Sequence, residues 1–334
     1  MTVSKPRLAV IPGDPNGIGP ELLARLLSEA RTREAADTLV IGERRVIMQG
    51  CNTAGKEIRL RPVTEDAIDW QGEGYPYLET SFITAEEITP AQVTEAGGRS
   101  ALRTLDKALA LAQAGVVQGV LFAPFNKAAL IAAGMGHEDE LHYMASQLGV
   151  TDYFCELNVL DGLWTSRVTS HIALKDVVPN ISKQKIVQAV GLIDETLKAA
   201  GVAEPRIAVC ALNPHGGDSG NFGREEIDIV APAVEEAKVI NAKVNGPWPA
   251  DTIFLKARAG EVDAVVTLYH DQGQIAMKLM GFDRGVTVQG GLPIPVATPA
   301  HGTAFDITGK GVAKVDATRA AFDLLCRLAA PQSA

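Results

Sequence analysis

The chain has 334 residues, of which 46% are hydrophobic and 21% are charged, and its formal net charge at pH 7 is −9. This length suits two packed subdomains and is long for a single hydrophobic core. The acidic balance excludes the basic footprint of a nucleic-acid-binding protein, so we expect no nucleic-acid partner.

The N-terminal segment lacks the character of a signal peptide. Its first apolar run ends at Ile11, and the polar Gly-Asp-Pro-Asn stretch follows at once. No stretch approaches the roughly 18 apolar residues of a membrane span. Four widely separated cysteines form no C-x-x-C pair, which predicts reduced, partly buried thiols. We therefore expect a cytoplasmic protein without a membrane partner.

In the first half of the chain, short apolar runs alternate with longer amphipathic stretches. The runs predict strands, and the amphipathic stretches predict helices because their apolar residues recur at helical spacing. The predicted elements are a strand at Arg7–Ile11, a helix at Pro20–Ala30, a strand at Leu39–Ile41, a helix at Arg99–Ala114 and a strand at Val120–Ala123.

In the middle of the chain, two extended runs, Asp152–Leu160 and Leu163–Ser170, are joined by Asp161-Gly162, a dipeptide that favours a hairpin turn. The pattern then returns to alternation. The later predictions are a helix at Lys183–Ala200, a strand at Arg206–Ala211, a helix at Glu225–Ala237, a strand at Ala264–Leu268 and a helix at Val315–Leu328. This order predicts one α/β enzyme unit over residues 1–334, with two interleaved subdomains and a mostly parallel sheet.

Three histidines stand at the ends of strand-like runs. His171 ends one such run, and His215 and His270 each follow a predicted strand beside a glycine-containing turn. In open α/β sheets, ligands bind just beyond the carboxyl ends of the strands. Three imidazoles delivered there are able to share one divalent ion and leave coordination positions for substrate. A single histidine in such a place is more often structural, so the prediction depends on all three together.

Three further features of the sequence bear on function. Asp251 suits a helix N-cap, and its carboxylate is also a candidate to lie close to the metal. The Gly13–Glu21 segment follows the first strand but does not match G-x-G-x-x-G, so we reject a Rossmann phosphate loop there. The segment His301–Gly311 has glycines and small residues that allow close approach of a flat ligand such as adenine, and it also suits an ordinary surface loop.

The His301–Gly311 segment resembles the loop that wraps the adenosine of NAD in isopropylmalate and isocitrate dehydrogenases, which implies their two-subdomain α/β/α fold. The chain as a whole, from Arg7 to Leu328, resembles the 4-hydroxythreonine-4-phosphate dehydrogenase family of pyridoxal phosphate (pyridoxine) biosynthesis. The motifs that carry this resemblance are Gly13–Glu21, Val168–His171, Leu174–Val177, Leu212–His215, Pro249–Thr252 and Tyr269–Gly273.

The resemblance implies a homodimer with the active site at the subunit interface. It implies one divalent metal ion (zinc, magnesium, manganese or cobalt) held by His171 and His215 of one subunit and His270 of the other. It also implies oxidation of a secondary alcohol with NAD or NADP, followed in the family by loss of carbon dioxide. The family's substrate lysine falls on Lys278, and we assign the catalytic roles to Lys278 and Asp251.

The resemblance also assigns the cofactor contacts. The residues expected to bind the cofactor are His301, Gly302, Thr303, Ala304 and Asp306.

The expected substrate pocket departs from the family. The family has a His-Thr pair that contacts substrate, and an ungapped count places Glu140 and Leu141 there. His137 and His142 lie nearby, but the equal loop length argues against a shift. Glu140 would repel an anionic substrate, so its gain changes the charge of the pocket.

Two further substrate contacts are also changed. The family's asparagine is Thr287 here, and its arginine is Val296. A valine cannot replace the bidentate anion site of an arginine. The sequence therefore predicts a dehydrogenase that acts on another hydroxy acid or a diol carboxylate, with Lys278, Glu140 and Thr287 at the substrate. The alternatives are a true 4-hydroxythreonine-4-phosphate dehydrogenase with a divergent pocket, and a non-catalytic binding protein on the same fold.

Overall fold

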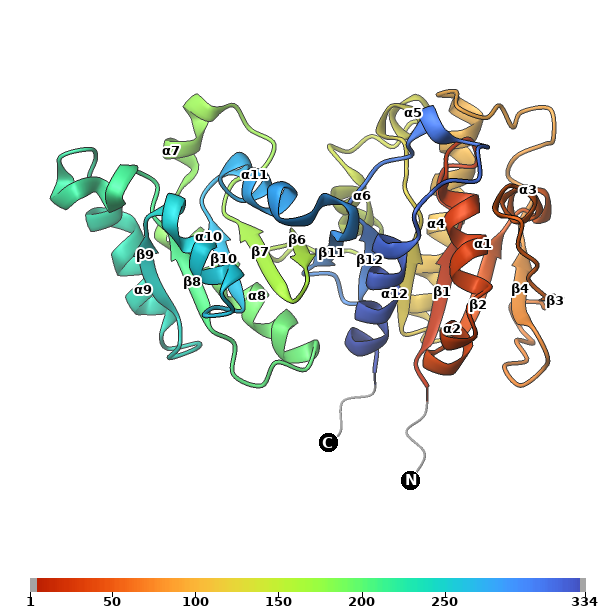
Figure 1. The fold of residues 1–334 in the computed structure, drawn as a ribbon, viewed down its shortest axis with the longest axis horizontal. Helices are drawn as coiled ribbons and strands as arrows, with labels where there is room; N and C mark the ends of the chain where they lie inside the picture. The colour runs from red at the N-terminus through yellow and green to blue at the C-terminus, as the bar shows by residue number, and fades with distance from the viewer. Residues whose placement is uncertain (1–4, 331–334) are drawn as a thin grey trace. The chain divides into compact units, whose positions relative to one another are not determined.

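The structure is a computed structural model that describes residues 5–330 (Figure 1). The chain forms two compact units. Unit 1 comprises the residues up to Val150 and those from Leu292 onward, and unit 2 comprises Thr151–Gly291. The chain thus leaves unit 1, builds all of unit 2 and returns to complete unit 1.

Unit 1 is built around parallel strands in the order β3-β4-β2-β1-β5-β12. Its strands are β1 (Arg7–Ile11), β2 (Asp37–Gly42), β3 (Leu60–Pro62), β4 (Tyr75–Glu79), β5 (Gly119–Phe122) and β12 (Val296–Pro299). Its helices are α1 (Gly19–Leu27), α2 (Ala30–Ala35), α3 (Arg44–Ala54), α4 (Glu95–Gln113), α5 (Lys127–Ala132), α6 (Glu140–Gln147) and α12 (Asp316–Leu328), with a 3-10 turn at Phe305–Ile307.

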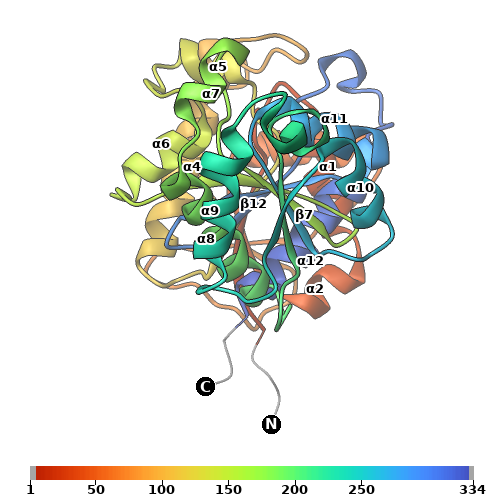
Figure 2. The same ribbon diagram turned by 90° about the vertical axis from the view of Figure 1, so that its left-hand side faces the viewer.

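Helices cover both faces of the unit 1 strands. Helix α4 lies on the opposite side of these strands from α1 and α12 (Figure 2). Leu105 and Leu109 of α4 pack with Ile11, Leu39 and Phe122 of the strands in one buried apolar cluster. Strands buried on both faces read as continuous apolar runs, which is why β1 and β5 were recognisable in the sequence.

Unit 2 contains strands in the order β11-β6-β7-β10-β8-β9. Its strands are β6 (Cys155–Leu160), β7 (Leu163–Arg167), β8 (Ile207–Cys210), β9 (Asn245–Trp248), β10 (Ala264–Thr267) and β11 (Val286–Gly290). Its helices are α7 (Val177–Asn180), α8 (Lys183–Ala199), α9 (Ala231–Ala237), α10 (Ala250–Arg258) and α11 (His270–Gly281), with a π-helical turn at Glu226–Val230 and 3-10 turns at Leu174–Asp176, Pro214–Gly220 and Phe282–Arg284.

The unit 2 strands run in two directions. Strands β7, β10, β8 and β9 are parallel neighbours, while β6 pairs antiparallel with both β7 and β11. Asp161 (φ 48°) and Gly162 (φ 90°) form the turn between β6 and β7. Both φ values are positive, as a type I′ hairpin turn requires, so the predicted hairpin is confirmed.

Helices α8 and α9 cover one face of the unit 2 strands, and α10 and α11 cover the other (Figure 2). On the second face, Ile253 of α10 and Met277 of α11 pack against Val265 of β10. In unit 1 the β1 strand and in unit 2 the α8 helix agree with the sequence prediction to within one residue. The mixed, mostly parallel α/β fold is confirmed.

Some predicted bounds were wrong. The predicted helix at Pro20–Ala30 is α1, which already ends at Leu27, and a separate helix α2 starts at Ala30. The predicted helix at Glu225–Ala237 starts with the π-helical turn before α9 begins at Ala231. Among the described residues, no helix has the length and apolar character to cross a membrane.

Candidate active site

Four neighbouring parallel strands of unit 2 deliver the predicted site residues from their carboxyl ends. His171 follows β7, His270 begins α11 directly after β10, and His215 follows β8. Asp251 lies in the first turn of α10, which follows β9. The structure therefore places these residues at the carboxyl edge of the unit 2 strands, where ligands of open α/β sheets bind.

The loops that carry His171 and His270 are held together. Beyond the last residue of β7, the Val168 N–H donates to the Thr267 carbonyl over 2.9 Å, and the Thr169 N–H donates to the Leu268 carbonyl over 3.2 Å. These bonds extend the pairing of the two strands up to the histidines. The imidazole centroids of His171 and His270 lie 5.8 Å apart within one chain.

Two imidazole nitrogens that are each about 2.1 Å from one ion place the ring centroids roughly 5–6 Å apart. The resemblance assigns His171 and His270 to different subunits, so their spacing within one chain does not test the shared metal ion, which stays a prediction. Two nitrogen donors of this type suit zinc, cobalt and similar divalent ions.

His215 lies in a turn of unusual backbone geometry. Residues 215 to 219 all have positive φ, with His215 at φ 55°. Left-handed backbone is costly for a residue with a side chain and collects at functional sites. The buried carboxylate of Glu226 anchors this turn, because its Oε1 accepts from the N–H groups of Leu212 and Asn213 over 2.7 Å each.

Glu226 stays ionised in spite of its burial. Burial alone would raise the pKa of its carboxyl group, but hydrogen bonds from Asn213 and Leu212 outweigh burial and lower the pKa. Glu226 was not recognised in the sequence, since an acidic residue in a helical pattern usually lies on a solvated face.

Gln272 joins the start of α11 to two strand ends. Its Oε1 accepts from the Leu268 N–H, and its Nε2 donates to the Ala211 carbonyl, each over 2.7 Å. The end of β8, from which the His215 turn starts, is therefore fixed relative to the His270 end of α11.

Asp251 and Lys278 occupy exposed positions on the two helices of this face. The N-cap of α10 is Pro249, so the N-cap role expected for Asp251 is wrong, and its carboxylate lies inside the first turn. An acidic group there is favoured by the helix dipole. Lys278 lies two turns after His270 on α11, which places both on one side of the helix.

The substrate positions differ in how the structure uses them. Thr287 is buried on β11, and its Oγ1 accepts from Asn158 Nδ2 over 3.1 Å. Val296 is fully buried in the apolar cluster of unit 1, and Leu141 is also buried. Leu141 and Val296 have therefore become apolar core residues.

The acidic and histidine residues around α6 have structural partners. Glu140 is the first residue of α6, and Asp139 is its N-cap. Asp139 Oδ1 also lies 2.7 Å from His142 Nδ1, and the ring of His137 packs edge-on against Tyr143. The structure thus gives His137 and His142 roles within unit 1.

The predicted cofactor loop lies at the carboxyl edge of the unit 1 sheet, after β12. His301, Gly302 and Asp306 are partly or fully exposed, and Ala304 has a left-handed φ of 44°. Thr303 is buried, and its carbonyl accepts from the Ile18 N–H over 3.1 Å. A Cβ on Gly302 would meet no atom within 4 Å, so open space lies beside this residue for a ligand.

The Gly13–Glu21 segment is buried beneath this loop. Protein acceptors already take the N–H groups of Asp14, Asn16, Gly17 and Ile18. A phosphate cradle needs free N–H groups that point at the ligand. The occupied donors support the rejection of a Rossmann phosphate loop.

Asp14 in this segment is a residue that the sequence did not reveal. It is fully buried, its Oδ1 accepts from the Asn16 N–H over 2.8 Å, and its Oδ2 has no hydrogen-bond partner. Burial raises the pKa of Asp14 to about 6, against the opposing effect of the Asn16 N–H. A Gly-Asp-Pro pattern is typical of an exposed turn, and only tertiary packing buries Asp14 here.

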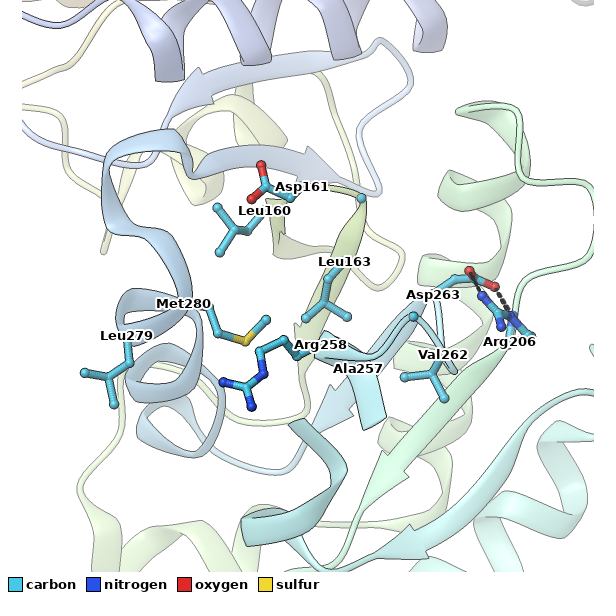
Figure 3. A pocket seen from close by; sticks show the side chains of 12 residues that line it. Leu160, Asp161, Leu163, Arg206, Ala257, Arg258, Val262, Asp263, Leu279 and Met280 are labelled. Atoms are coloured by element: carbon cyan, nitrogen blue, oxygen red, sulfur yellow. Dashed lines mark hydrogen bonds and ion pairs between the residues drawn. The ribbon is translucent and has the colours of Figure 1, made fainter. Parts of the chain in front are cut away.

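A pocket of about 580 Å³ lies at the opposite end of the unit 2 strands (Figure 3). Its lining includes the Asp161–Gly162 turn before β7, Asp263 before β10 and Arg206 before β8. It contains none of the predicted site residues. Arg206 and Asp263 pair with each other there, so this end of the sheet is separate from the candidate active site.

The four cysteines are free, as predicted. Burial raises the pKa of the thiols of Cys155, to about 11, and of Cys210 and Cys326, each to about 12. A neutral thiol is a poor nucleophile and metal ligand.

Comparison with known proteins gives a consistent result. Residues 34–325 match the family model described as pyridoxal phosphate biosynthetic protein PdxA. A Pseudomonas aeruginosa protein with the provisional name 4-hydroxythreonine-4-phosphate dehydrogenase 2 is 53% identical over 97% of both chains. D-threonate 4-phosphate dehydrogenase of Pectobacterium atrosepticum is 36% identical over 96% of this chain and 99% of its own.

Solved structures agree with these relatives. The crystal structure of 4-hydroxythreonine-4-phosphate dehydrogenase from Klebsiella pneumoniae superposes with a TM-score of 0.85 and 33% identity, over 99% of this chain and 100% of that one. The match extends over both units, so the fold and the order of its elements are shared along the whole chain.

Proposed function

This chain belongs to the PdxA family of pyridoxal phosphate biosynthetic proteins, and we propose that it is a metal-dependent NAD(P) dehydrogenase with an altered substrate. Its relatives are named dehydrogenases of phosphorylated hydroxy acids, so the chain is an oxidoreductase that acts on a CH–OH group. The proposed reaction oxidises the secondary alcohol of a hydroxy acid or diol carboxylate. Where the product is a β-keto acid, loss of carbon dioxide follows.

The proposed metal ligands are His171, His215 and His270. The strands that precede these histidines are parallel neighbours and deliver all three at their carboxyl ends, which supports a metal site at this edge. When bound, a divalent ion would act as a Lewis acid on the substrate oxygens and stabilise the enolate of decarboxylation. Lys278 is proposed to hold the substrate carboxylate, and Asp251 to act beside the metal ligands at the same edge.

The proposed cofactor is NAD or NADP, with its adenosine half on the His301–Gly311 loop. The open space beside Gly302 supports this placement, because a flat ring is able to approach the backbone there. His301 is partly exposed and Asp306 is exposed on the same loop, and both are proposed contacts, while Thr303 and Ala304 shape the backbone.

The observation that carries the altered substrate is the loss of anion-binding donors. Val296 lies in the core where the family has an arginine, and Leu141 is buried where the family has a threonine. A charge-assisted hydrogen bond contributes on the order of 1.5–3 kcal/mol. Two lost contacts would therefore lower turnover of the family's substrate by about a thousandfold, since roughly 1.4 kcal/mol is tenfold.

The second candidate is a true 4-hydroxythreonine-4-phosphate dehydrogenase, favoured by the name of the 53% identical relative. The deciding measurement is kcat/KM on 4-phosphohydroxy-L-threonine, D-threonate 4-phosphate and unphosphorylated hydroxy acids and diol carboxylates, with metal and either nicotinamide cofactor. We expect the first substrate to give a value well below about 10⁴ M⁻¹s⁻¹ and another to exceed it. An ordinary value on the first substrate would establish the second candidate instead.

We further propose a cytoplasmic homodimer with the active site at the subunit interface. Large apolar side chains are exposed on the two helices of one unit 2 face: Leu255 on α10 is 57% exposed, and Ile275 and Leu279 on α11 are 58% and 84% exposed. Exposed apolar surface of this kind marks association sites. The four free cysteines support the cytoplasmic location.

A further inference from the structure

A layer of polar side chains lies on the face of the unit 2 strands that α11 covers. The register of β6 and β11 pairs Asn158 with Thr287. It also pairs Glu156 with Gln289, and residues that are two apart on a strand share one face of a sheet. Gln274 of α11 donates through Nε2 to Asn158 Oδ1 over 2.5 Å, which places the helix over this face. Thr287 is a proposed substrate contact, so the layer borders the proposed substrate site.

Most polar groups in this layer satisfy one another. Thr287 Oγ1 accepts from Asn158 Nδ2 over 3.1 Å, and Asn158 Oδ1 accepts from Arg167 Nη1 over 2.9 Å. The Arg167 side chain is only 5% exposed, its Nη2 pairs with the Glu156 carboxylate, and its Nε donates to Ser170 Oγ over 3.0 Å. Because every guanidinium nitrogen is engaged and Glu156 balances the charge, Arg167 does not supply a site for a phosphate group.

Gln289 is the exception in this layer. The residue is only 2% exposed, and neither its Oε1 nor its Nε2 has a hydrogen-bond partner within the chain. A buried amide without partners costs free energy, because it has lost water and gained nothing in exchange. Buried polar atoms of this kind are completed by a ligand or by ordered water.

The strand geometry places Gln289 where a ligand is expected. Strands β11 and β7 both pair antiparallel with β6, so they run in the same direction. Gln289 is the last but one residue of β11 and therefore lies at the carboxyl edge, where ligands of α/β sheets bind. The side chain of Glu156, its neighbour in the register, is 20% exposed, so the layer reaches solvent at this end.

The chemistry of an amide indicates which group it binds. Gln289 offers a donor at Nε2 and an acceptor at Oε1, and an alcohol hydroxyl is able to pair with both because it donates and accepts. An ionised phosphate oxygen only accepts, so it would satisfy Nε2 and leave Oε1 facing negative charge. The amide therefore suits a hydroxyl group better than a phosphate group.

We propose that Gln289 is a specificity-determining residue that binds a second hydroxyl group of the substrate, one that is not oxidised. The substrate class is then an unphosphorylated polyhydroxy acid or diol carboxylate. This inference rests on the proposed function and deepens it, since it names the group by which this dehydrogenase distinguishes its substrate from the phosphorylated hydroxy acids.

The test is steady-state kinetics on matched pairs of substrates, with a divalent metal ion and NAD or NADP. The pairs are D-threonate with D-threonate 4-phosphate, and 4-hydroxy-L-threonine with 4-phosphohydroxy-L-threonine, and a cyclic cis-diol carboxylate completes the panel. We expect the unaltered chain to prefer unphosphorylated substrates by at least about tenfold in kcat/KM.

The main variant is Gln289→Met, which keeps the length and volume of the side chain but removes both polar atoms. We expect kcat/KM on the preferred substrate to fall by about 10–100-fold, mainly through a higher KM, as the loss of two neutral hydrogen bonds predicts. The melting temperature should stay the same or rise, because the variant no longer buries an amide without partners.

Thr38→Val is the matched control. Thr38 is 3% exposed on β2 of unit 1, and its Oγ1 also lacks a hydrogen-bond partner. We expect this variant to melt at the same or a higher temperature with kcat and KM unchanged. A purely structural role for Gln289 predicts instead that Gln289→Met behaves as Thr38→Val does.

Three results would overturn the inference. If Gln289→Met keeps kcat/KM within about twofold on every substrate that the unaltered chain oxidises, Gln289 does not determine specificity, and the proposed function stands. If the unaltered chain prefers the phosphorylated member of each pair, the substrate class is wrong although the chain is a dehydrogenase. If it oxidises no hydroxy acid or diol carboxylate, phosphorylated or not, the proposed function fails and this inference fails with it.

Discussion

The carboxyl ends of the strands hold the candidate functional loops in different ways in the two units. In unit 1, backbone groups and small residues make the contacts: the Ile18 N–H donates to the Thr303 carbonyl, and Gly17 lies against Thr303. In unit 2, imidazoles stand at the strand ends, above the buried side chains of Arg167 and Asn158. Small, backbone-lined surfaces suit a flat ring, whereas imidazoles on a rigid support suit a metal ion.

Under the proposed function, each unit has a separate task. Unit 1 would recognise the cofactor by shape and close approach, and unit 2 would bind the metal ion through side-chain chemistry. Five substitutions test this division, and each affects one edge or one face of the molecule.

The largest effect is expected for His215→Asn. Asparagine tolerates the left-handed φ of 55° better than alanine does, so the turn should survive while the imidazole is lost. We expect metal affinity to fall by more than about 100-fold, since even an indirect loss costs 10–100-fold. Isothermal titration with Zn²⁺ measures this, and Asp218→Asn in the same turn is the control.

Full metal occupancy in the His215→Asn protein would remove His215 from the ligand set. In that case other side chains at the unit 2 edge would bind the ion in place of His215.

The next effect is expected for Gly302→Val in the cofactor loop. Its Cβ would enter open space, so the folded protein should tolerate the change while the cofactor loses room. We expect the NAD dissociation constant to rise at least about tenfold, or roughly 1.4 kcal/mol, with metal affinity unchanged. Fluorescence titration of NADH measures the binding.

Gly17→Ala is the matched contrast to Gly302→Val. A Cβ there would lie 2.8 Å from Thr303 Cβ, so the loop must shift. We expect a loss of stability of about 1–3 kcal/mol, as in other overpacked sites. If Gly302→Val lowers the melting temperature as much as Gly17→Ala does and leaves NAD binding intact, the loop has a structural role only.

Asp14 is a buried carboxylic acid at the carboxyl edge of unit 1, where backbone groups and small residues make the other contacts. Its burial predicts that the stability of the fold depends on pH. Its pKa rises from 3.8 in an exposed carboxyl to about 6 in the folded chain. The folded state holds its proton more tightly than the unfolded state, so Asp14 favours folding below about pH 4. That advantage is lost as the pH rises through about 6. A pKa change of this size corresponds to a difference of roughly 3 kcal/mol in the free energy of unfolding between low and high pH.

Asp14→Asn should therefore stabilise the protein at pH 8 by up to about 3 kcal/mol and have little effect near pH 4. Urea unfolding across this pH range measures the difference, and the exposed Asp218→Asn provides the control. Equal stabilisation at every pH would show that the carboxyl does not titrate in the folded chain as its burial predicts.

The smallest effect is expected for Leu279→Asp on the proposed dimer face. One apolar side chain at an interface typically contributes about 1–2 kcal/mol, so we expect dissociation to become about tenfold easier. Light scattering over a dilution series measures the mass. Val239→Asp, at a position that is 90% exposed after α9, is the control. If Leu279→Asp leaves the mass profile unchanged, the dimer interface does not include this part of α11.

Some elements of the fold follow from short-range patterns in the sequence. The apolar run of β1 and the periodicity of α8 predict those elements to within a residue, and Asp161-Gly162 predicts the hairpin. These signals are local, because one strand or turn imposes its own spacing and its own φ values. Helix α11 was missed, since its glycines weaken the helical pattern. Tertiary contacts explain its formation: Gly273 packs on Thr267, and Gln274 bonds to Asn158.

The sequence by itself determined the type of fold, the rejection of a phosphate loop and the placement of three histidines after strands. Only the tertiary structure decided that the strands before His171, His215 and His270 are neighbours, because their pairing joins segments far apart in the chain. It also decided the burial of Asp14, Val296 and Arg167. Burial is a property of everything packed around a residue, so it raises the pKa of the Asp14 carboxyl and places Val296 in the core, and no local pattern contains either result.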